Sequence, residues 1–162
     1  MTAVRRRVIE SPEAMAKLGA TIARELRAGD LVLLNGELGA GKTTLTRGIG
    51  EALGVRGAVT SPTFVLARTH PRPSGPPLVH VDAYRLGSAV ELDDLDLDFA
   101  ASIVVVEWGA GLLDGVAESW LSVDIARPHG GDPEAEVEPR DVVLTGNGPR
   151  WQKLEWLDAA RD

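Results

Sequence analysis

The sequence predicts an α/β fold with a mixed, mostly parallel central sheet, flanked by helices and carrying an inserted hairpin. Two short apolar runs, at residues 31–35 and 103–106, are typical of strands buried on both faces of a parallel sheet. Segments with apolar residues at helical spacing precede and follow the first run. Residues 120–127 alternate apolar and polar side chains, as a half-buried strand does. Strand and helix patterns therefore follow one another along the chain.

Length and composition limit the classes of protein to consider. At 162 residues the chain is expected to form one domain over residues 1–162. It has no cysteine, which excludes disulfides and thiolate metal sites and fits a reducing compartment. Because no apolar run reaches transmembrane or signal-peptide length, we expect a cytoplasmic protein without membrane contact. The net charge of −7 argues against independent, high-affinity binding of RNA or DNA.

The first helix is predicted over residues 11–30. Ser11 is a suitable N-cap, Pro12 suits the first helical position, and Gly29 ends the pattern. One apolar stripe along this segment is formed by Met15, Leu18, Ile22 and Leu26. The preceding cluster Arg5–Arg7 is interpreted as the solvated end of a first strand, and a local phosphate contact is the alternative.

A glycine-rich stretch, GELGAGKTT, follows the first apolar run and matches the pattern G-x-x-x-x-G-K-[ST] of a P-loop. Its residues are Gly36, Glu37, Leu38, Gly39, Ala40, Gly41, Lys42, Thr43 and Thr44. Glycines allow a tight turn whose N–H groups cradle phosphate oxygens, and a helix that starts near Lys42 adds its positive end. Lys42 is expected to reach the β- and γ-phosphates, and the Thr43 hydroxyl to bind Mg²⁺. Strand, loop and helix stand in the order that a P-loop NTPase fold requires.

The rest of the chain supplies further strands. Residues 64–68 and 78–82 are predicted to pair as the inserted hairpin, with residues 70–77 as its loop. The acidic segment 88–98 is interpreted as a helical turn or two with a solvated face. Residues 141–145 are expected to pair with the alternating strand 120–127, and residues 150–162 to form an amphipathic helix with Trp151, Leu154 and Leu157 on one side.

Acidic partners for a P-loop are expected at the carboxyl ends of neighbouring strands. Glu107 ends the apolar run 103–106, where a Walker-B carboxylate belongs, and Asp82 ends the strand 78–82. Thr63 lies in a proline-containing turn after the P-loop helix, where a switch loop could sense the γ-phosphate. His80 alternates onto the same face as Asp82 and is assigned only a supporting role.

The nucleotide is predicted to be ATP. The guanine-specifying pattern N-K-x-D is absent, because the two lysines outside the P-loop stand in AKLG and QKLE. Two other readings stay open at this point: a small-molecule kinase, and a nucleotide-dependent binding module that does not hydrolyse ATP.

Four motifs in this order, GELGAGKTT, SPTF, HVDAYRL with ELDDLDLD, and VVVEWG, closely resemble the TsaE (YjeE-type) family of P-loop ATPases. The resemblance covers about residues 8–145. It implies an ATPase that supports formation of threonylcarbamoyladenosine at position 37 of tRNAs reading ANN codons. It also implies partnership with a TsaB–TsaD complex, with tRNA met only indirectly and the ATP cycle serving repeated turnover.

The same resemblance implies roles for individual residues. Thr43 and Glu107 match the family's Mg²⁺ ligands, Lys42 its P-loop lysine, and Asp82 its catalytically important aspartate. Ser11 falls at the helix start that approaches the nucleotide, and Arg140 or its neighbours in the last hairpin are expected to flank the adenine.

Overall fold

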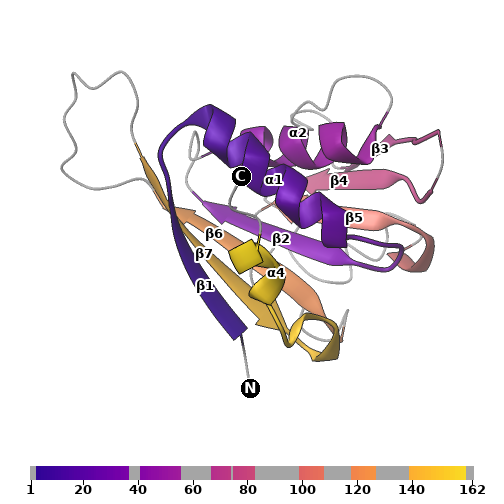
Figure 1. Ribbon diagram of the computed structural model, residues 1–162. Helices are drawn as coiled ribbons and strands as arrows, with labels where there is room; N and C mark the ends of the chain where they lie inside the picture. The colour runs from indigo at the N-terminus through magenta and orange to yellow at the C-terminus, as the bar shows by residue number, and fades with distance from the viewer. Residues whose placement is uncertain are drawn as a thin grey trace.

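The structure is a computed structural model that describes residues 3–36, 41–55, 67–73, 75–82, 99–107, 118–126 and 139–159 (Figure 1). Its strands are β1 (Ala3–Ile9), β2 (Leu31–Gly36), β3 (Ala67–His70), β4 (Leu78–Asp82), β5 (Ile103–Glu107), β6 (Trp120–Ala126) and β7 (Arg140–Asn147). Its helices are α1 (Pro12–Glu25), α2 (Lys42–Leu53) and α4 (Glu155–Ala159), with 3₁₀ turns η2 (Phe99–Ala101) and η3 (Pro149–Trp151).

One seven-stranded sheet has the order β1-β7-β6-β2-β5-β4-β3. Strands β6, β2, β5 and β4 run parallel to one another, whereas β1 with β7, β7 with β6, and β3 with β4 pair antiparallel. The predicted mixed, mostly parallel sheet with an added hairpin is therefore confirmed. The antiparallel pairs lie at the two sides of the sheet, and the parallel strands form its centre.

The strands β2 and β5 lie at the centre of the sheet because their sequences contain continuous runs of apolar residues. All five residues of β5 and the first four of β2 are buried, as strands covered on both faces require. The predicted pairing of β6 with β7 is also confirmed. In the β3–β4 hairpin, the prediction that His70 lies in the loop is wrong, because it pairs with Leu78 and is almost fully buried. Residues 64–66, predicted to begin this strand, lie outside the described residues.

Helices α1 and α2 lie side by side over one face of the sheet (Figure 1). Ser11 caps α1 as predicted, its Oγ accepting the N–H of Ala14 at 3.1 Å. The helix ends at Glu25 rather than continuing to Gly29, because Leu26 turns into extended backbone. Gly54 ends α2 in the left-handed conformation, as predicted.

The core fills the space between this sheet face and the two long helices. Buried apolar side chains from the sheet, the helices and the C-terminal segment pack there into one cluster. The helices contribute Met15, Leu18, Ile22, Leu45 and Ile49. The strands contribute Val32, Leu34, Val105, Leu121, Val123, Ile125, Val142 and Leu144, among others. One apolar cluster therefore joins the two helices and the C-terminal segment to this face of the sheet.

The prediction of one amphipathic helix over residues 150–162 is wrong at its start, and residues 160–162 lie outside the described residues. Among the described residues of this segment, Glu155–Ala159 alone is α-helical, and the 3₁₀ turn Pro149–Trp151 precedes it. The three apolar residues of the predicted stripe are buried nonetheless, since Trp151, Leu154 and Leu157 join the core. No helix in the described part of the chain is long and apolar enough to cross a membrane.

Ion pairs hold the C-terminal segment against the rest of the fold. Arg5 and Arg7 of β1 both reach Asp158, at 3.2 Å and 2.7 Å, so these arginines are paired rather than simply solvated. Arg150 contacts both carboxylate oxygens of Asp30, each at 3.1 Å. The pairs with Asp158 bring the two ends of the described chain together, and Arg150 joins the C-terminal segment to the start of β2.

Candidate functional site

The carboxyl ends of the parallel strands meet at one edge of the sheet. Leu34 of β2 is in register with Glu107 of β5, and Asp82 of β4 is in register with the same Glu107. Gly36, the last residue of β2, is in register with Ile125 near the end of β6. Ligands of open α/β sheets bind at this kind of edge. Asp82 and Glu107 are thus brought to neighbouring strand ends, as predicted.

Gly41 and Lys42, at the start of α2, have a backbone and a charge that suit phosphate. Gly41 precedes the helix with a φ of 121°, a conformation that favours glycine. Lys42 is the first residue of α2 and is only 7% exposed. Its Nζ donates to the carbonyl oxygen of Gly36 at 2.5 Å. The ammonium group therefore lies against the end of β2 from which the loop departs.

The first turn of α2 adds hydroxyl and N–H groups. Thr43 and Thr44 are half-buried in this turn. Gly41 offers no side chain to cap the helix, and N–H groups at a helix start point toward an incoming anion. The positive end of the helix therefore adds to the charge of Lys42 at the same place.

Glu107 is a buried carboxylate at the end of β5, with 4% of its surface exposed. Its Oε2 lies 2.8 Å from Nε2 of His80, a side chain that is completely buried. Because a carboxylate only accepts hydrogen bonds, the Nε2 of His80 is the donor. This bond joins β4 and β5 directly at the candidate site.

The donors at this edge fit a hard divalent cation. The Thr43 hydroxyl and the Glu107 carboxylate both offer oxygen, which Mg²⁺ prefers. Within the described ranges, no group of three His, Cys, Asp or Glu side chains could hold a metal ion. Mg²⁺ commonly takes one or two protein oxygens together with substrate phosphates. The residues present therefore fit a cation that arrives with a nucleotide.

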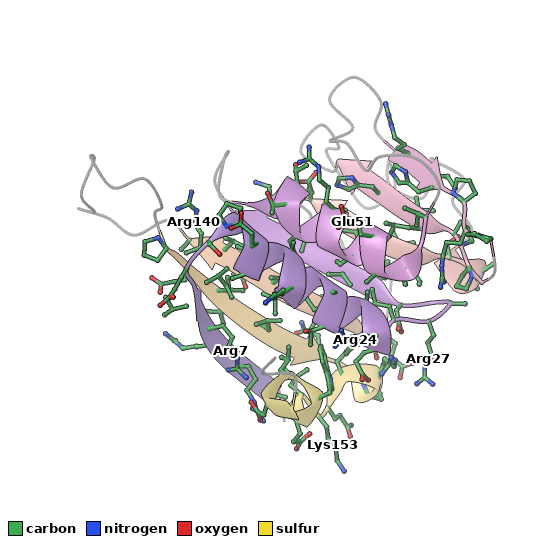
Figure 2. The ribbon with its side chains drawn as sticks, turned by 45° about the horizontal axis from the view of Figure 1, so that its top comes forward. Arg7, Arg24, Arg27, Glu51, Arg140 and Lys153 are labelled. Carbon is green, nitrogen blue, oxygen red and sulfur yellow. The ribbon has the colours of Figure 1, made fainter. Side chains whose placement is uncertain are left out.

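Ser11 and Arg140 come to the same edge from distant parts of the sequence. Arg140 begins β7 opposite Ile9, the last residue of β1, and Ser11 follows two positions later. Figure 2 shows Arg140 at this end of the sheet, near the start of α1. The side chain of Met15, one turn into α1, lies 3.2 Å from the place where a Cβ on Gly41 would be. The structure therefore places the start of α1 beside the start of α2.

Several predicted site residues lie outside the described residues. They are Glu37, Leu38, Gly39, Ala40 and Thr63, together with the acidic segment 88–98. The backbone of Asp82 is described as the end of β4, whereas its side chain is not. Its predicted role therefore stays a prediction.

A second buried histidine lies on the neighbouring strand. His70 is 4% exposed, and its Nε2 has no hydrogen-bond partner among the residues that the structure describes. Burial lowers the pKa of His70, and the nearby His80 and Arg68 lower it further. The neutral imidazole is thus the favoured form of His70 in the folded protein.

Sequence reasoning missed the bond between His80 and Glu107. The alternation of β4 placed His80 on the face of Asp82, but the pairing of β4 with β5 was needed to bring it to Glu107. It also missed Met15 as a neighbour of the P-loop glycine, because that contact depends on how the two helices pack.

Comparisons with known proteins show which family the chain resembles. A family model described as threonylcarbamoyl adenosine biosynthesis protein TsaE matches residues 9–134. The tRNA threonylcarbamoyladenosine biosynthesis protein TsaE of Streptomyces coelicolor is 59% identical over 141 residues, covering 85% of this chain and 93% of that protein. The protein of the same name from Bacillus subtilis is 36% identical over 148 residues, covering 90% of this chain and 85% of that protein. The crystal structure of Bacillus subtilis YdiB matches with a TM-score of 0.75 and 27% identity, over 99% of this chain and 95% of that one. The chain therefore belongs to the TsaE family.

Proposed function

We propose that this protein binds and hydrolyses Mg-ATP to support repeated formation of threonylcarbamoyladenosine at position 37 of tRNAs that read ANN codons. The observation that carries the proposal is the meeting of Lys42, the start of α2 and Glu107 at one sheet edge. The relatives' names, which specify tRNA threonylcarbamoyladenosine biosynthesis, support the biological role.

Phosphate binding is the task of Lys42 and the helix start. The ammonium of Lys42 donates to the Gly36 carbonyl at the end of β2, and it would donate to phosphate oxygens when a nucleotide binds. N–H groups in the first turn of α2 would bind the same negative charge. Arginine's wider planar fork fits such a cradle poorly, which explains a lysine here in a chain rich in arginine.

Thr43 and Glu107 would hold the cation. Bound with the nucleotide, Mg²⁺ would neutralise charge on the β- and γ-phosphates. The hydroxyl of Thr43 is placed by the first turn of α2, and the carboxylate of Glu107 by the end of β5. Asp82, in register with Glu107, is proposed to orient the attacking water.

The proposed purpose of ATP binding and hydrolysis is to control association with a partner complex. The net charge of −7 disfavours tight, independent tRNA binding, so the protein would meet tRNA through a TsaB–TsaD complex. Segments that follow a P-loop change their order when the γ-phosphate is lost, and such a change can alter the grip on a partner.

The first test is Mg-ATP binding by the Lys42→Ala variant. We expect loss of measurable Mg-ATP binding in calorimetry, because the phosphates lose their side-chain cation. Lys17→Ala is the matched control, since Lys17 is exposed on α1 and should leave affinity unchanged. Wild-type affinity in Lys42→Ala would overturn the site.

A phosphate-release assay on the wild-type protein separates the rival activities. Release of inorganic phosphate from ATP with no added acceptor supports an ATPase and excludes a non-hydrolysing binding module. Phosphate transfer to a small-molecule acceptor, without release to water, would instead support a kinase.

A further inference from the structure

His80 has no role in the function proposed so far, yet it contacts that function's carboxylate directly. It is the middle residue of β4, 0% exposed, and its Nε2 lies 2.8 Å from Oε2 of Glu107. Strands β4 and β5 are neighbours in the sheet, and the two residues stand 27 positions apart in the sequence.

A buried hydrogen bond of this kind restricts the carboxylate. A glutamate side chain has three rotatable bonds, and holding one oxygen selects among their rotamers. The bond to His80 occupies Oε2 of Glu107, so Oε1 of the same carboxylate is available for another partner. Groups that orient metal ligands in this way commonly change metal affinity or activity by about 10–100-fold when they are replaced.

We propose that His80 is a positioning residue: its Nε2–H holds the Glu107 carboxylate so that the remaining oxygen serves the Mg²⁺ of bound ATP. This inference rests on the proposed function, because it assigns His80 to the cation site of that function. His80 acts through Glu107 and touches neither the nucleotide nor the reacting atoms.

Three substitutions distinguish a positioned donor from a residue that only fills space. The amide nitrogen of His80→Gln stands as many bonds from Cα as the imidazole Nε2 does, so it can keep the bond to Glu107. The amide nitrogen of His80→Asn stands where Nδ1 does, one bond short. His80→Leu retains an apolar body without a donor.

The measurement is ATP affinity by calorimetry, in EDTA and at graded Mg²⁺. We expect the Mg²⁺ concentration for half-maximal enhancement of ATP binding to rise by about 10–100-fold in His80→Asn and His80→Leu. It should stay within about threefold of wild type in His80→Gln, and affinity in EDTA should be unchanged in all three. His70→Leu is the matched control, because His70 is a similarly buried histidine on the adjacent strand.

The outcomes separate this inference from the proposed function. If Mg²⁺ strengthens ATP binding to wild type and His80→Asn responds like wild type, the positioning role is overturned while the site stands. Equal defects in His80→Gln and His80→Asn overturn it too. If wild type shows no Mg²⁺ response, both proposals fail. Glu107→Gln adds a second readout, since His80→Asn should cause little further loss in that background.

Discussion

Lys42, His80 and Glu107 are buried polar residues that share one edge of the sheet. Removing charged groups from water is unfavourable unless hydrogen bonds or opposite charges compensate. Lys42 has the Gly36 carbonyl, and Glu107 has His80. Phosphates and a cation would supply stronger partners for the two charged groups, so nucleotide binding should also stabilise the fold.

His70 gives a pH prediction at the scale of one residue. Because the folded state lowers its pKa, the unfolded chain binds this proton more readily. The neutral His70 therefore makes its full contribution to the stability of the folded protein above the unfolded pKa of about 6.5. That contribution is lost as the pH falls from there through the folded pKa. Thermal unfolding midpoints between about pH 7.5 and 5.5 should therefore fall less steeply in His70→Leu than in wild type. Parallel curves for the two proteins would contradict the prediction.

The contact between α1 and α2 is unusually close because glycines meet in it. A Cβ on Gly48 would collide with the carbonyl oxygen of Ala16 and lie 2.8 Å from its Cα. A Cβ on Gly19 would lie 2.9 Å from the backbone nitrogen of Ile49. This packing sets the start of α1 beside the P-loop helix, and hence Ser11 near the candidate site.

Gly48→Ala tests this packing at the scale of the helix pair. Helix propensity alone would favour alanine by about 1 kcal/mol. We expect instead a loss of about 1–3 kcal/mol in the free energy of unfolding, because backbone atoms must move. Glu51→Ala, an exposed change on the same helix, should stay within about 0.5 kcal/mol (Figure 2). Denaturant unfolding measures both, and a stabilised Gly48→Ala would show that the helices are not in contact as described.

Arg150→Lys tests the attachment of the C-terminal segment. Arg150 reaches both oxygens of Asp30, the carbonyl of Glu25 and the ring of Trp151, whose centroid lies 4.2 Å away. A lysine cannot make this planar set of contacts. We expect a loss of about 1–3 kcal/mol in unfolding free energy, since Asp30 stays buried while Arg150 is partly solvated. Arg24→Lys, an exposed change on α1, should have little effect in the same denaturation experiment.

The elements that could be predicted from sequence carry their own local signals. Ser11 and Pro12 mark the start of α1, Gly54 marks the end of α2, and unbroken apolar residues mark β2 and β5. The C-terminal helix begins later than its apolar spacing predicts, because that spacing does not include the contacts that Arg150 and its neighbours make. Local periodicity cannot include contacts with distant elements.

The site shows the same division. The glycines, Lys42 and Thr43 are adjacent in sequence, so one motif identifies them. The His80–Glu107 bond depends on the pairing of β4 with β5, which the sequence pattern does not specify.

At the scale of the whole molecule, the site edge collects distant parts of the chain. The starts of α1 and α2, the ends of β4 and β5 and the first residue of β7 all reach it. The matched family region stops at residue 134, whereas β7 begins at Arg140, so Arg140 is an adenine contact only by prediction. The antiparallel pair β1–β7 nevertheless places it opposite Ile9, two positions before Ser11.

Reconstituted tRNA modification with the TsaB–TsaD proteins, under excess tRNA, threonylcarbamoyl donor and ATP, tests the central claim most directly. Wild-type protein should support many rounds per complex, and Lys17→Ala should match it. Asp82→Ala should stall after about one round, because ATP binding would remain while the hydrolysis that resets the complex is lost. Equal multiple turnover with and without this protein would contradict the account.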